Sequence, residues 1–559
     1  MDFATPYLTE QIIAYIGNKR KLLSLIYRAM ENTGIEIKPG LKFFDVFSGS
    51  GVVSRLAKSL KFEVFTNDWE YYSYILSSCY LTCNNKDITT LFGGEEKLEK
   101  LLEEINNLPS PKEEDCYIAK YYGPKEDDIN AVDYKTERLF YTRENALTID
   151  KIRNYIEETY PLSNTSEENL KKRNILLANL IYECATHTNT SGVFKAYHKG
   201  FGGYSKDALK RILGQIALHL PVLIDSDYPV HVYQKNANEL VRQLKGVDIA
   251  YLDPPYNQHQ YGGNYHMLNT IAKWDKIPAL LTLNDKGVLK EKAAIRHDWV
   301  NTRSEYCYTQ TAVDNFRDLI ENLDAKYILI SYSTDGIIPF EDLKEICMKK
   351  GKVGVVTNEY TTYRGGKQSN KRKNTNIEFI LTIDTTKEST EETVKQLDTI
   401  FLKKKFLLLF KEHFSYKALK EKASNIDGDI FTFTLNNNDS FKVKTNYCFT
   451  ITPLEDVTTY SLEKINSIIS LLTPMTCKTK EEELSEIFNR IVNNEDVTSR
   501  LWRLIPQTLK KLAHKKNQEV FTLWLNNTKK LEEQHKEEYS VIKDKLNAVE
   551  EIANKRFIS

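Results

Sequence analysis

The chain has 559 residues in which 77 Lys and Arg balance 77 Asp and Glu, so its formal net charge is zero. This balance excludes nucleic-acid binding through overall charge and leaves that role to local basic patches. The length predicts roughly two to four domains, since one ordinary core does not extend over so long a chain.

Cysteine usage and apolar runs indicate a cytoplasmic protein. The eight cysteines are scattered, and Cys79 and Cys83, which lie close together, have no second pair or His cluster. We therefore expect reduced thiols and no metal site. The first residues lack the basic and apolar regions of a secretory signal. The most apolar short run, residues 406–410, is far below the ~20 residues of a membrane span, so no membrane partner is expected.

The first part of the chain, residues 1–85, has the pattern of a sheet domain. Residues 11–30 have helical spacing after a short glycine-containing turn. Over residues 41–76, "KFFDVF" is apolar like a buried strand, "SGSG" is a turn, "VVSRLAKSL" has helical spacing and "FEVFTND" is a second strand. A strand–helix–strand unit of this kind begins a parallel sheet.

The remainder divides into three regions. Residues 86–230 are irregular and rich in charge and tyrosine, and residues 231–388 resume the alternation of strands and helices. The predicted fold class is therefore α/β, a doubly wound sheet with an inserted region. Residues 389–559 follow a polar stretch and form an additional mixed, mostly helical domain. Its last segment, Leu531 to Phe557, is an amphipathic helix expected to pack on its own domain, with an intermolecular coiled coil as the alternative.

The turn Phe47–Gly51, "FSGSG", lies between the first strand and a helix N-terminus. Glycines there allow a ligand to approach the backbone, although a plain tight turn has the same pattern. The second strand ends at Asn67 and Asp68. An acidic residue at that position can accept hydrogen bonds from ribose hydroxyls, or can cap the next helix. Together the two features favour a nucleoside-bearing cofactor.

The turn Asp253–Tyr256, "DPPY", follows a later strand and carries the chemistry. The prolines fix the turn and leave the Pro254 carbonyl free to accept a hydrogen bond. The Asp253 carboxylate and that carbonyl can hold one amino group, and Tyr256 offers a flat face for a planar base. An amino group on an aromatic ring is a poor nucleophile because its lone pair is delocalised. Two acceptors favour the tetrahedral geometry that attacks an electrophilic methyl group.

These motifs in this order resemble a known family. "YIGNKRKLL" at 15–23, then "FSGSG", then Asn67-Asp68, a long insertion and "DPPY" are similar to the alpha-group, Dam-type DNA adenine-N6 methyltransferases over roughly residues 8–385. The resemblance implies a Rossmann-like methyltransferase sheet, S-adenosyl-L-methionine as cofactor and double-stranded DNA as substrate. It also implies that residues 86–230 recognise the target, with 1–85 binding the cofactor and 231–388 completing the catalytic part.

The resemblance implies roles for individual residues. The residues placed against the cofactor are Tyr15, Gly17, Lys19, Phe47, Ser48, Gly49, Gly51, Asp68 and Asp253. Asn238 stands where the family often has an Asp that holds the cofactor's adenine, so this contact would be made by an amide. The residues that hold the flipped adenine are Asp253, Pro254, Pro255 and Tyr256.

DNA contacts are expected from three places. Residues 187–203 are similar to a segment that follows the recognition insertion in this family, with Lys195 where the family has Asn. The Gly-Gly loop after "DPPY" is suited to cover an extruded nucleotide, and an ordinary polar loop is the alternative. The basic segment 363–373 is either a phosphate-binding or a solvated loop. The candidate DNA-binding residues are Tyr141, Arg143, Asn189, Lys195, Tyr261, Tyr265, His266, Arg364, Lys367 and Arg372.

The predicted function is methylation of adenine N6 at a short sequence in duplex DNA, within a restriction–modification system whose cognate endonuclease acts separately. Methylation of cytosine N4 and of an RNA adenine are the alternatives with the same chemistry. For residues 389–559 the alternatives are extended DNA recognition, subunit contact or a nuclease. The recognition sequence and the oligomeric state are not specified by one sequence.

Overall fold

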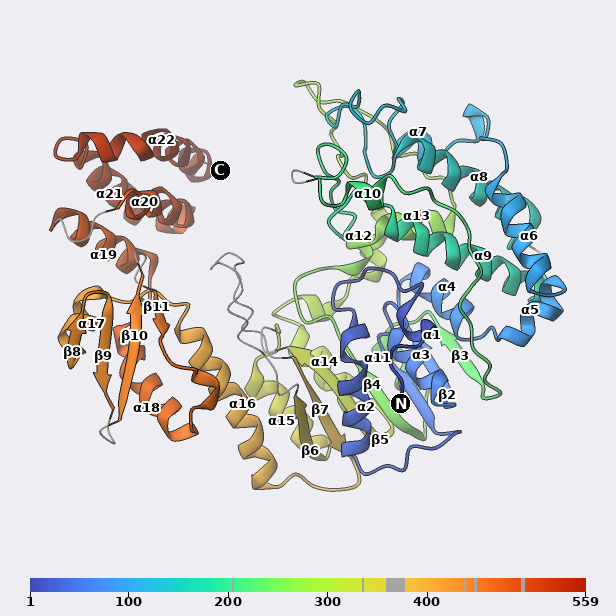
Figure 1. The fold of residues 1–559 in the computed structure, drawn as a ribbon, viewed down its shortest axis with the longest axis horizontal. Coiled ribbons are helices and arrows are strands. Elements are labelled where there is room, and N and C mark those ends of the chain that lie inside the picture. Colours follow the sequence, from blue (N-terminus) through green and yellow to red (C-terminus); the bar gives the residue numbers. More distant parts are fainter. Residues whose placement is uncertain are drawn as a thin grey trace. The chain divides into compact units, whose positions relative to one another are not determined.

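The computed structural model describes residues 1–163, 165–203, 206–333, 336–357, 378–435, 439–446, 450–493 and 498–558. The chain forms two compact units (Figure 1). One comprises Met1–Tyr363 and Asn376–Val394, and the other includes Lys395–Ser559. The second unit begins inside helix α16 (Glu391–Leu409), slightly after the boundary expected at 388–389.

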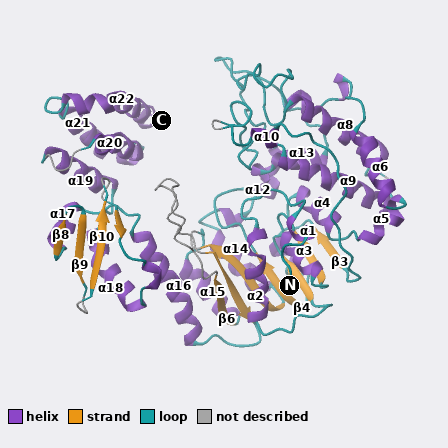
Figure 2. Ribbon diagram, in the orientation of Figure 1, coloured by secondary structure: helices purple, strands orange, loops and turns teal. Residues whose placement is uncertain are grey.

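A seven-stranded sheet is the centre of the first unit (Figure 2). Its strands are β1 (Lys42–Asp45), β2 (Glu63–Asn67), β3 (Val230–Tyr233), β4 (Val247–Leu252), β5 (Ala325–Ser333), β6 (Lys352–Thr357) and β7 (Glu378–Asp384). The order is β3-β2-β1-β4-β5-β7-β6, and only β7 runs antiparallel to its neighbours among these strands. The predicted doubly wound α/β fold is confirmed, while β6 was not anticipated.

The strand order reverses beside β1. In register, Asp45 at the end of β1 lies opposite Thr66 of β2 and Tyr251 of β4. Because these strands are parallel, the loops that follow them leave the sheet at the same edge. Ligands of doubly wound sheets bind at such a point, outside the carboxyl ends of the strands. The fold therefore brings the two sequence motifs to one place.

Helices cover both faces of the sheet. They are α1 (Pro6–Thr9), α2 (Leu23–Asn32), α3 (Val52–Ser59), α4 (Tyr71–Tyr80), α11 (Ala237–Leu240), α14 (Ala312–Asn322) and α15 (Phe340–Lys350). The helix predicted over 11–30 was wrong in its first half, since α2 begins only at Leu23. Gly17 has φ 76°, and Asn18 caps the 3-10 helix η1 (Lys19–Leu22). These two residues end the helical spacing and leave residues 10–18 as an irregular segment.

A helical region follows β2 and α4 in the chain. Its helices are α5 (Asn85–Phe92), α6 (Glu95–Asn106), α7 (Ile118–Tyr121), α8 (Arg143–Thr159), α9 (Glu167–Thr186), α10 (Leu209–Ile212), α12 (Tyr261–Asn264) and α13 (His266–Lys273). Helices α4, α9 and α13 pack together around one apolar core that includes Leu176, Leu180 and Leu268. Thus α12 and α13, which follow β4, join the helices of the insertion. The functional division at 86–230 stays a prediction.

The C-terminal unit is built differently. Its sheet, in the order β11-β10-β9-β8, is antiparallel, and its strands are β8 (Asn425–Asp427), β9 (Ile430–Thr434), β10 (Ser440–Thr445) and β11 (Ile451–Pro453). Its other helices are α17 (Tyr416–Lys422), α18 (Leu462–Leu472), α19 (Lys480–Val492), α20 (Ser499–Leu512), α21 (Gln518–Lys530) and α22 (Lys536–Ile558). Ile542 and Leu546 of α22 share a buried core with Trp502 of α20, which confirms that the last helix packs on its own domain.

Candidate active site

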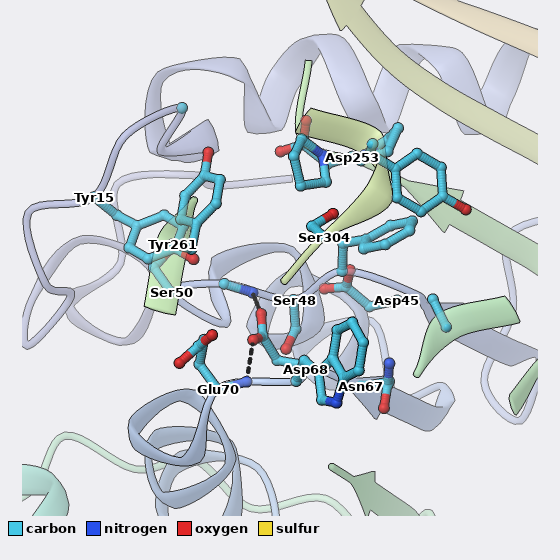
Figure 3. Close-up of a pocket in the computed structure, with 18 of the residues that line it drawn as sticks. Tyr15, Asp45, Ser48, Ser50, Asn67, Asp68, Glu70, Asp253, Tyr261 and Ser304 are labelled. Atoms are coloured by element: carbon cyan, nitrogen blue, oxygen red, sulfur yellow. Dashed lines mark hydrogen bonds between the residues drawn. The ribbon is translucent and has the colours of Figure 1, made fainter. Parts of the chain in front are cut away.

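A cleft lies at the carboxyl ends of β1, β2 and β4 (Figure 3). It has about 1080 Å³ of empty volume, open solvent at its mouth included. Its walls come from the loops after the three strands, from residues 15–19 and from residues 302–306. Of the predicted cofactor and catalytic residues, the lining includes Tyr15, Gly17, Lys19, Phe47, Ser48, Gly49, Asp68, Asn238, Asp253, Pro254, Pro255 and Tyr256.

The loop after β1 is held by backbone hydrogen bonds to the end of β2. Ser48 N–H donates to the Asn67 carbonyl at 2.9 Å, and Gly49 N–H donates to Asp68 Oδ2 at 2.8 Å. A β-carbon on Gly49 would lie 2.7 Å from Tyr15 Cε1, and its φ is 53°, so glycine is required there. Gly51, with φ 76°, precedes α3 and does not line the cleft. Gly51 is the N-cap residue of α3.

Two acidic side chains follow β2 on one wall. Asp68 Oδ1 also accepts from Glu70 N–H at 2.9 Å, so this carboxyl joins two loops instead of capping α4. Burial raises the pKa of Asp68 above its ordinary value. Glu70 was not anticipated. It accepts from Asn269 Nδ2 at 2.6 Å, and its burial, with Asp68 nearby, raises its pKa to about 7.

Asp45, the last residue of β1, lines the cleft and was also not anticipated. Its Oδ2 accepts from Ser54 Oγ at 2.7 Å, whereas its Oδ1 has no hydrogen-bond partner among the described residues. The Oγ of Ser48 is likewise buried without such a partner. Burial raises the pKa of Asp45 to about 7. A buried acceptor without a partner calls for an explanation, and a bound donor group supplies one.

The N-terminal segment contributes an aromatic wall. The Tyr15 ring stacks on Tyr265 at 4.8 Å between ring centroids and on Tyr261 at 5.2 Å. Tyr265 Oη accepts from Ile16 N–H at 2.8 Å. This stack joins the segment before η1 to the helices after β4. Tyr15 and Tyr261 line the cleft, while Tyr265 is fully buried behind them.

The turn after β4 presents a charged pair and an aromatic ring. Asp253 Oδ1 lies 3.2 Å from Lys19 Nζ, and the Lys19 side chain is 5% exposed. The same Nζ lies 5.5 Å from the centroid of the Tyr256 ring. Gly17 has φ 76°, a conformation that favours glycine, and a β-carbon placed on it would lie 3.5 Å from Tyr256 Oη, at ordinary van der Waals distance. Residues 15–19 and 253–256, both expected at the ligand site, are in contact with each other.

Asn238 lines the cleft, but its amide binds protein groups. Its Nδ2 donates to the Asn315 carbonyl at 2.9 Å and to Asp318 Oδ2 at 2.7 Å, and its Oδ1 accepts from Tyr306 Oη at 2.7 Å. The Tyr306 ring in turn meets the Phe47 ring edge to face at 5.4 Å. Asn238 thus orients an aromatic wall, and the residues that follow α13 add Tyr306, which sequence patterns did not indicate.

Several candidate DNA contacts are core residues instead. Tyr141, Asn189, Tyr265 and His266 are all fully buried. Asn189 holds the Leu139 carbonyl, and His266 Nε2 lies 3.0 Å from the Phe194 carbonyl. The assignment of these four side chains to DNA contact is therefore corrected: helix packing removes them from the surface. Desolvation also lowers the pKa of His266 to about 4.

The other candidates have different positions. Arg143, at the start of α8, is partly buried and donates to the Ala119 carbonyl at 3.1 Å. Lys195 is exposed, and its Cε lies 3.6 Å from a β-carbon placed on Gly263 of α12. Arg364, Lys367 and Arg372 lie outside the described residues. Lys195, beside α12, and Tyr261, within α12, are thus the candidates near the helix that follows the catalytic turn.

The sheet and the cleft define a class: a doubly wound α/β enzyme whose ligand site joins a glycine loop, an acidic wall and a "DPPY" turn. A family model, D12 class N6 adenine-specific DNA methyltransferase, matches residues 15–321. The chain belongs to this family. It is accordingly an enzyme that transfers a methyl group from a donor to adenine N6 in DNA. No helix in the described residues has the length and apolarity to cross a membrane.

Similar proteins include enzymes from bacteria and a virus. Type II methyltransferase M.NlaIII of Neisseria lactamica is 33% identical over 367 residues, 65% of this chain and 96% of that protein. Type II methyltransferase M.CviAII of Paramecium bursaria Chlorella virus 1 is 30% identical over 356 residues, 63% of this chain and 93% of that protein. Type II methyltransferase M.FokI of Planomicrobium okeanokoites is 31% identical over 341 residues, which are 60% of this chain and 47% of that protein.

Proposed function

We propose that this enzyme uses S-adenosyl-L-methionine to methylate adenine in duplex DNA and acts as the modification enzyme of a restriction–modification system. The observation that carries the proposal is the position of Asp253. It lies at the end of β4, paired with Lys19, on the same cleft as the glycine loop after β1. The names of the relatives, type II methyltransferases, support the biological setting. A cognate endonuclease acting separately is the partner that this setting implies.

The residues of the cleft fit this cofactor. Its cationic methionine part matches the unpartnered Asp45 Oδ1 and Ser48 Oγ beside the glycine loop. Asp68 and Glu70 are the acceptors for ribose hydroxyls, and Phe47 with Tyr306 offers apolar faces for the adenine. When bound there, S-adenosyl-L-methionine supplies an electrophilic methyl group on a sulfonium. The lining of the cleft and the motif both support the proposal that Phe47, Ser48 and Gly49 contact the cofactor.

Asp253 and Pro254 act on the target base in this proposal. The Asp253 carboxylate accepts a hydrogen bond from the adenine amino group, and Lys19 holds that carboxylate in place at 3.2 Å. The Pro254 carbonyl is the second acceptor. Acceptors placed in advance favour the tetrahedral nitrogen of the transition state without reorganising during the reaction. No general base is required, because the amino proton becomes acidic once the methyl group is attached.

Tyr256 and the loop after it receive the extruded base. The Tyr256 ring is fixed edge to face against Tyr332 at 6.0 Å, which leaves it as a rigid surface for stacking. Base extrusion costs a few kcal/mol, and stacking of this kind offsets it. Lys195 and Tyr261 are the side chains proposed to contact the nucleotide or its phosphates. Residues 86–230, with α12 and α13 packed among their helices, are proposed to read the target sequence.

The test is chemical. The purified chain is incubated with unmethylated genomic DNA and S-adenosyl-L-methionine, and the DNA is digested to nucleosides for mass spectrometry. The expected product is N6-methyl-2′-deoxyadenosine. A restriction enzyme that no longer cuts the treated DNA at one short sequence would identify the target. N4-methylcytosine, product only with RNA, or no product beside an active reference methylase would contradict the proposal.

A further inference from the structure

The C-terminal unit carries a local excess of positive charge in a chain of zero net charge. Residues 498–518 contain six Lys and Arg and no Asp or Glu. Helix α20 and the 3-10 helix η7 (Lys515–Asn517) make up most of this segment. Five of its basic residues, here called the α20 stripe, are Arg503, Lys510, Lys511, Lys515 and Lys516.

The stripe residues that belong to α20 lie on its exposed side. Leu501, Trp502, Ile505 and Leu509 face the core that α20 shares with α19, α21 and α22. Arg503 and Lys510 lie seven residues apart on the exposed side, which places them on the same side two turns apart. The apolar face fixes the orientation of the helix, so the charged face is presented rigidly to solvent.

The positive charge of the stripe is not neutralised within the described residues. Arg503, Lys510, Lys511, Lys515 and Lys516 form no ion pair with any residue for which the structure describes a position. Other exposed lysines of the same unit do form such pairs. The residues in these pairs are Lys529 with Glu550 and Lys543 with Glu532. The stripe is distinguished from the surrounding surface by its segment, residues 498–518, which contains no Asp or Glu.

Helix stability explains only part of the stripe. Lys510 and Lys511 lie in the last turn of α20, where the helix dipole favours cations. Arg503, near the start of α20, and Lys515 and Lys516, in η7, are not explained in this way. An anionic partner accounts for the basic residues along the whole stripe.

We propose that the α20 stripe, whose residues do not line the cleft of the first unit, binds the phosphate backbone of the DNA substrate. This inference rests on the proposed function, because that function supplies the polyanion. From Arg503 to Lys511 the helix extends about 12 Å at 1.5 Å per residue. A DNA strand presents a phosphate about every 3.4 Å of its axis, so several phosphates lie within reach of such a stripe. Contacts to phosphate add affinity without reading sequence.

The experiment compares two full-length variants of equal charge. One carries Arg503→Gln, Lys510→Gln and Lys511→Gln, and the control carries Lys536→Gln, Lys545→Gln and Lys555→Gln on α22. All six side chains are exposed, so folding is expected to be retained, and circular dichroism checks this. Affinity for a labelled, unmethylated DNA duplex is measured by fluorescence anisotropy over a range of salt concentrations. Methyl transfer is measured separately at saturating DNA and cofactor.

The stripe variant is expected to bind DNA about tenfold or more weakly, with the slope of log K against log salt reduced by about 2–3, since each lost phosphate contact removes about 0.9. The control variant should keep both values, and both variants should keep the wild-type rate at saturating DNA. Equal affinity and slope in the two variants would overturn the inference. Failure of the proposed function would give a different result. The wild-type chain would then form no methylated product, whatever its affinity for DNA.

Discussion

Two buried aspartates in the first unit show how differently one residue type is used. Asp150 on α8 is fully buried, and its two carboxyl oxygens accept backbone N–H groups of Ile118 and Ala119 at 2.8 and 2.9 Å. Asp45 at the end of β1 is 1% exposed, yet only one of its oxygens has a partner among the described residues. Burial raises the pKa of both carboxyls, to about 6 for Asp150 and to about 7 for Asp45.

The difference lies in the neighbours and not in the degree of burial. Asp150 supplies the hydrogen bonds that the start of α7 needs, so its acceptors are used up in the helical region. Asp45 keeps one acceptor directed at a cleft that a cationic ligand can enter. We infer that a buried carboxyl indicates function here only when an acceptor remains for a ligand.

The largest expected effect is at Asp253. Asp253→Asn keeps the size of the side chain but removes the charged acceptor of the adenine amino group. We expect the methyl-transfer rate at saturating substrates to fall about 10²–10³-fold, as for loss of one preorganised group that stabilises a transition state. Cofactor affinity should change little. Single-turnover assays with labelled S-adenosyl-L-methionine give the rate, and equilibrium dialysis gives the affinity.

Asp248→Asn is the matched control for that variant. Asp248 lies on the same strand, and its Oδ2 accepts from Lys42 N–H at 2.9 Å, away from the cleft. It should keep the wild-type rate. If both variants retained full turnover, Asp253 would have no catalytic role, and the reading of the "DPPY" turn would fail.

The next effect concerns stability. Asp150→Ala leaves the N–H groups of Ile118 and Ala119 buried without their acceptor, and we expect it to lower the free energy of unfolding by about 2–4 kcal/mol. Urea denaturation followed by circular dichroism measures this. Cofactor affinity of the folded variant should be unchanged. A variant as stable as the wild type would show that Asp150 does not hold α7, and the contrast with Asp45 would disappear.

The sequence was sufficient for the parts of the site that depend on local order. "FSGSG" and "DPPY" each follow a strand, and parallel pairing of β1 with β4 brings such turns to one edge. The sequence could therefore place Gly49 and Asp253 in one cleft without a structure. The Lys19–Asp253 contact was not predicted, because it joins segments far apart in the chain.

The errors arose where long-range packing decides. Tyr265 and His266 follow the catalytic turn closely, yet α13 packs against α4 and α9 and buries both residues. The helix predicted from the spacing over 11–30 was wrong in its first half, because Gly17 has a left-handed backbone conformation that ends the periodicity. Asp45 went unrecognised for another reason. Nothing in "KFFDVF" reveals that one carboxyl oxygen lacks a partner, since that depends on which neighbours surround the strand.

Asp45→Asn tests the comparison directly. The amide keeps an acceptor for Ser54 but cannot carry the negative charge that matches a cationic methyl donor. We expect the dissociation constant for S-adenosyl-L-methionine to rise about tenfold, which corresponds to about 1.4 kcal/mol. Isothermal titration calorimetry measures it. Asp150→Asn is the control, and its dissociation constant should equal that of the wild type. Equal affinities in all three proteins would mean that Asp45 does not contact the cofactor.

The smallest effect is a dependence of cofactor affinity on pH. The pKa values of Asp45 and Glu70 are raised to about 7 by burial, so both carboxyls are largely protonated at pH 6 in the free protein. A cationic donor binds better to carboxylates and lowers their pKa values. Affinity should therefore rise as pH increases from about 5 to about 7 and level off above, by up to tenfold for each unit of pKa that binding removes.

Proton release distinguishes this linkage from a general effect of pH on folding. At pH 7, binding should release protons, so the calorimetric heat should differ between buffers of different ionisation enthalpy. Asp45→Asn should release fewer protons than the wild type, and Asp150→Asn should release the same number. The raised pKa also makes each carboxyl favour the protonated native state, so stability of the free protein should fall as pH rises from about 4 to 7. Bound cofactor should oppose that fall, because it stabilises the carboxylates that the free cleft disfavours.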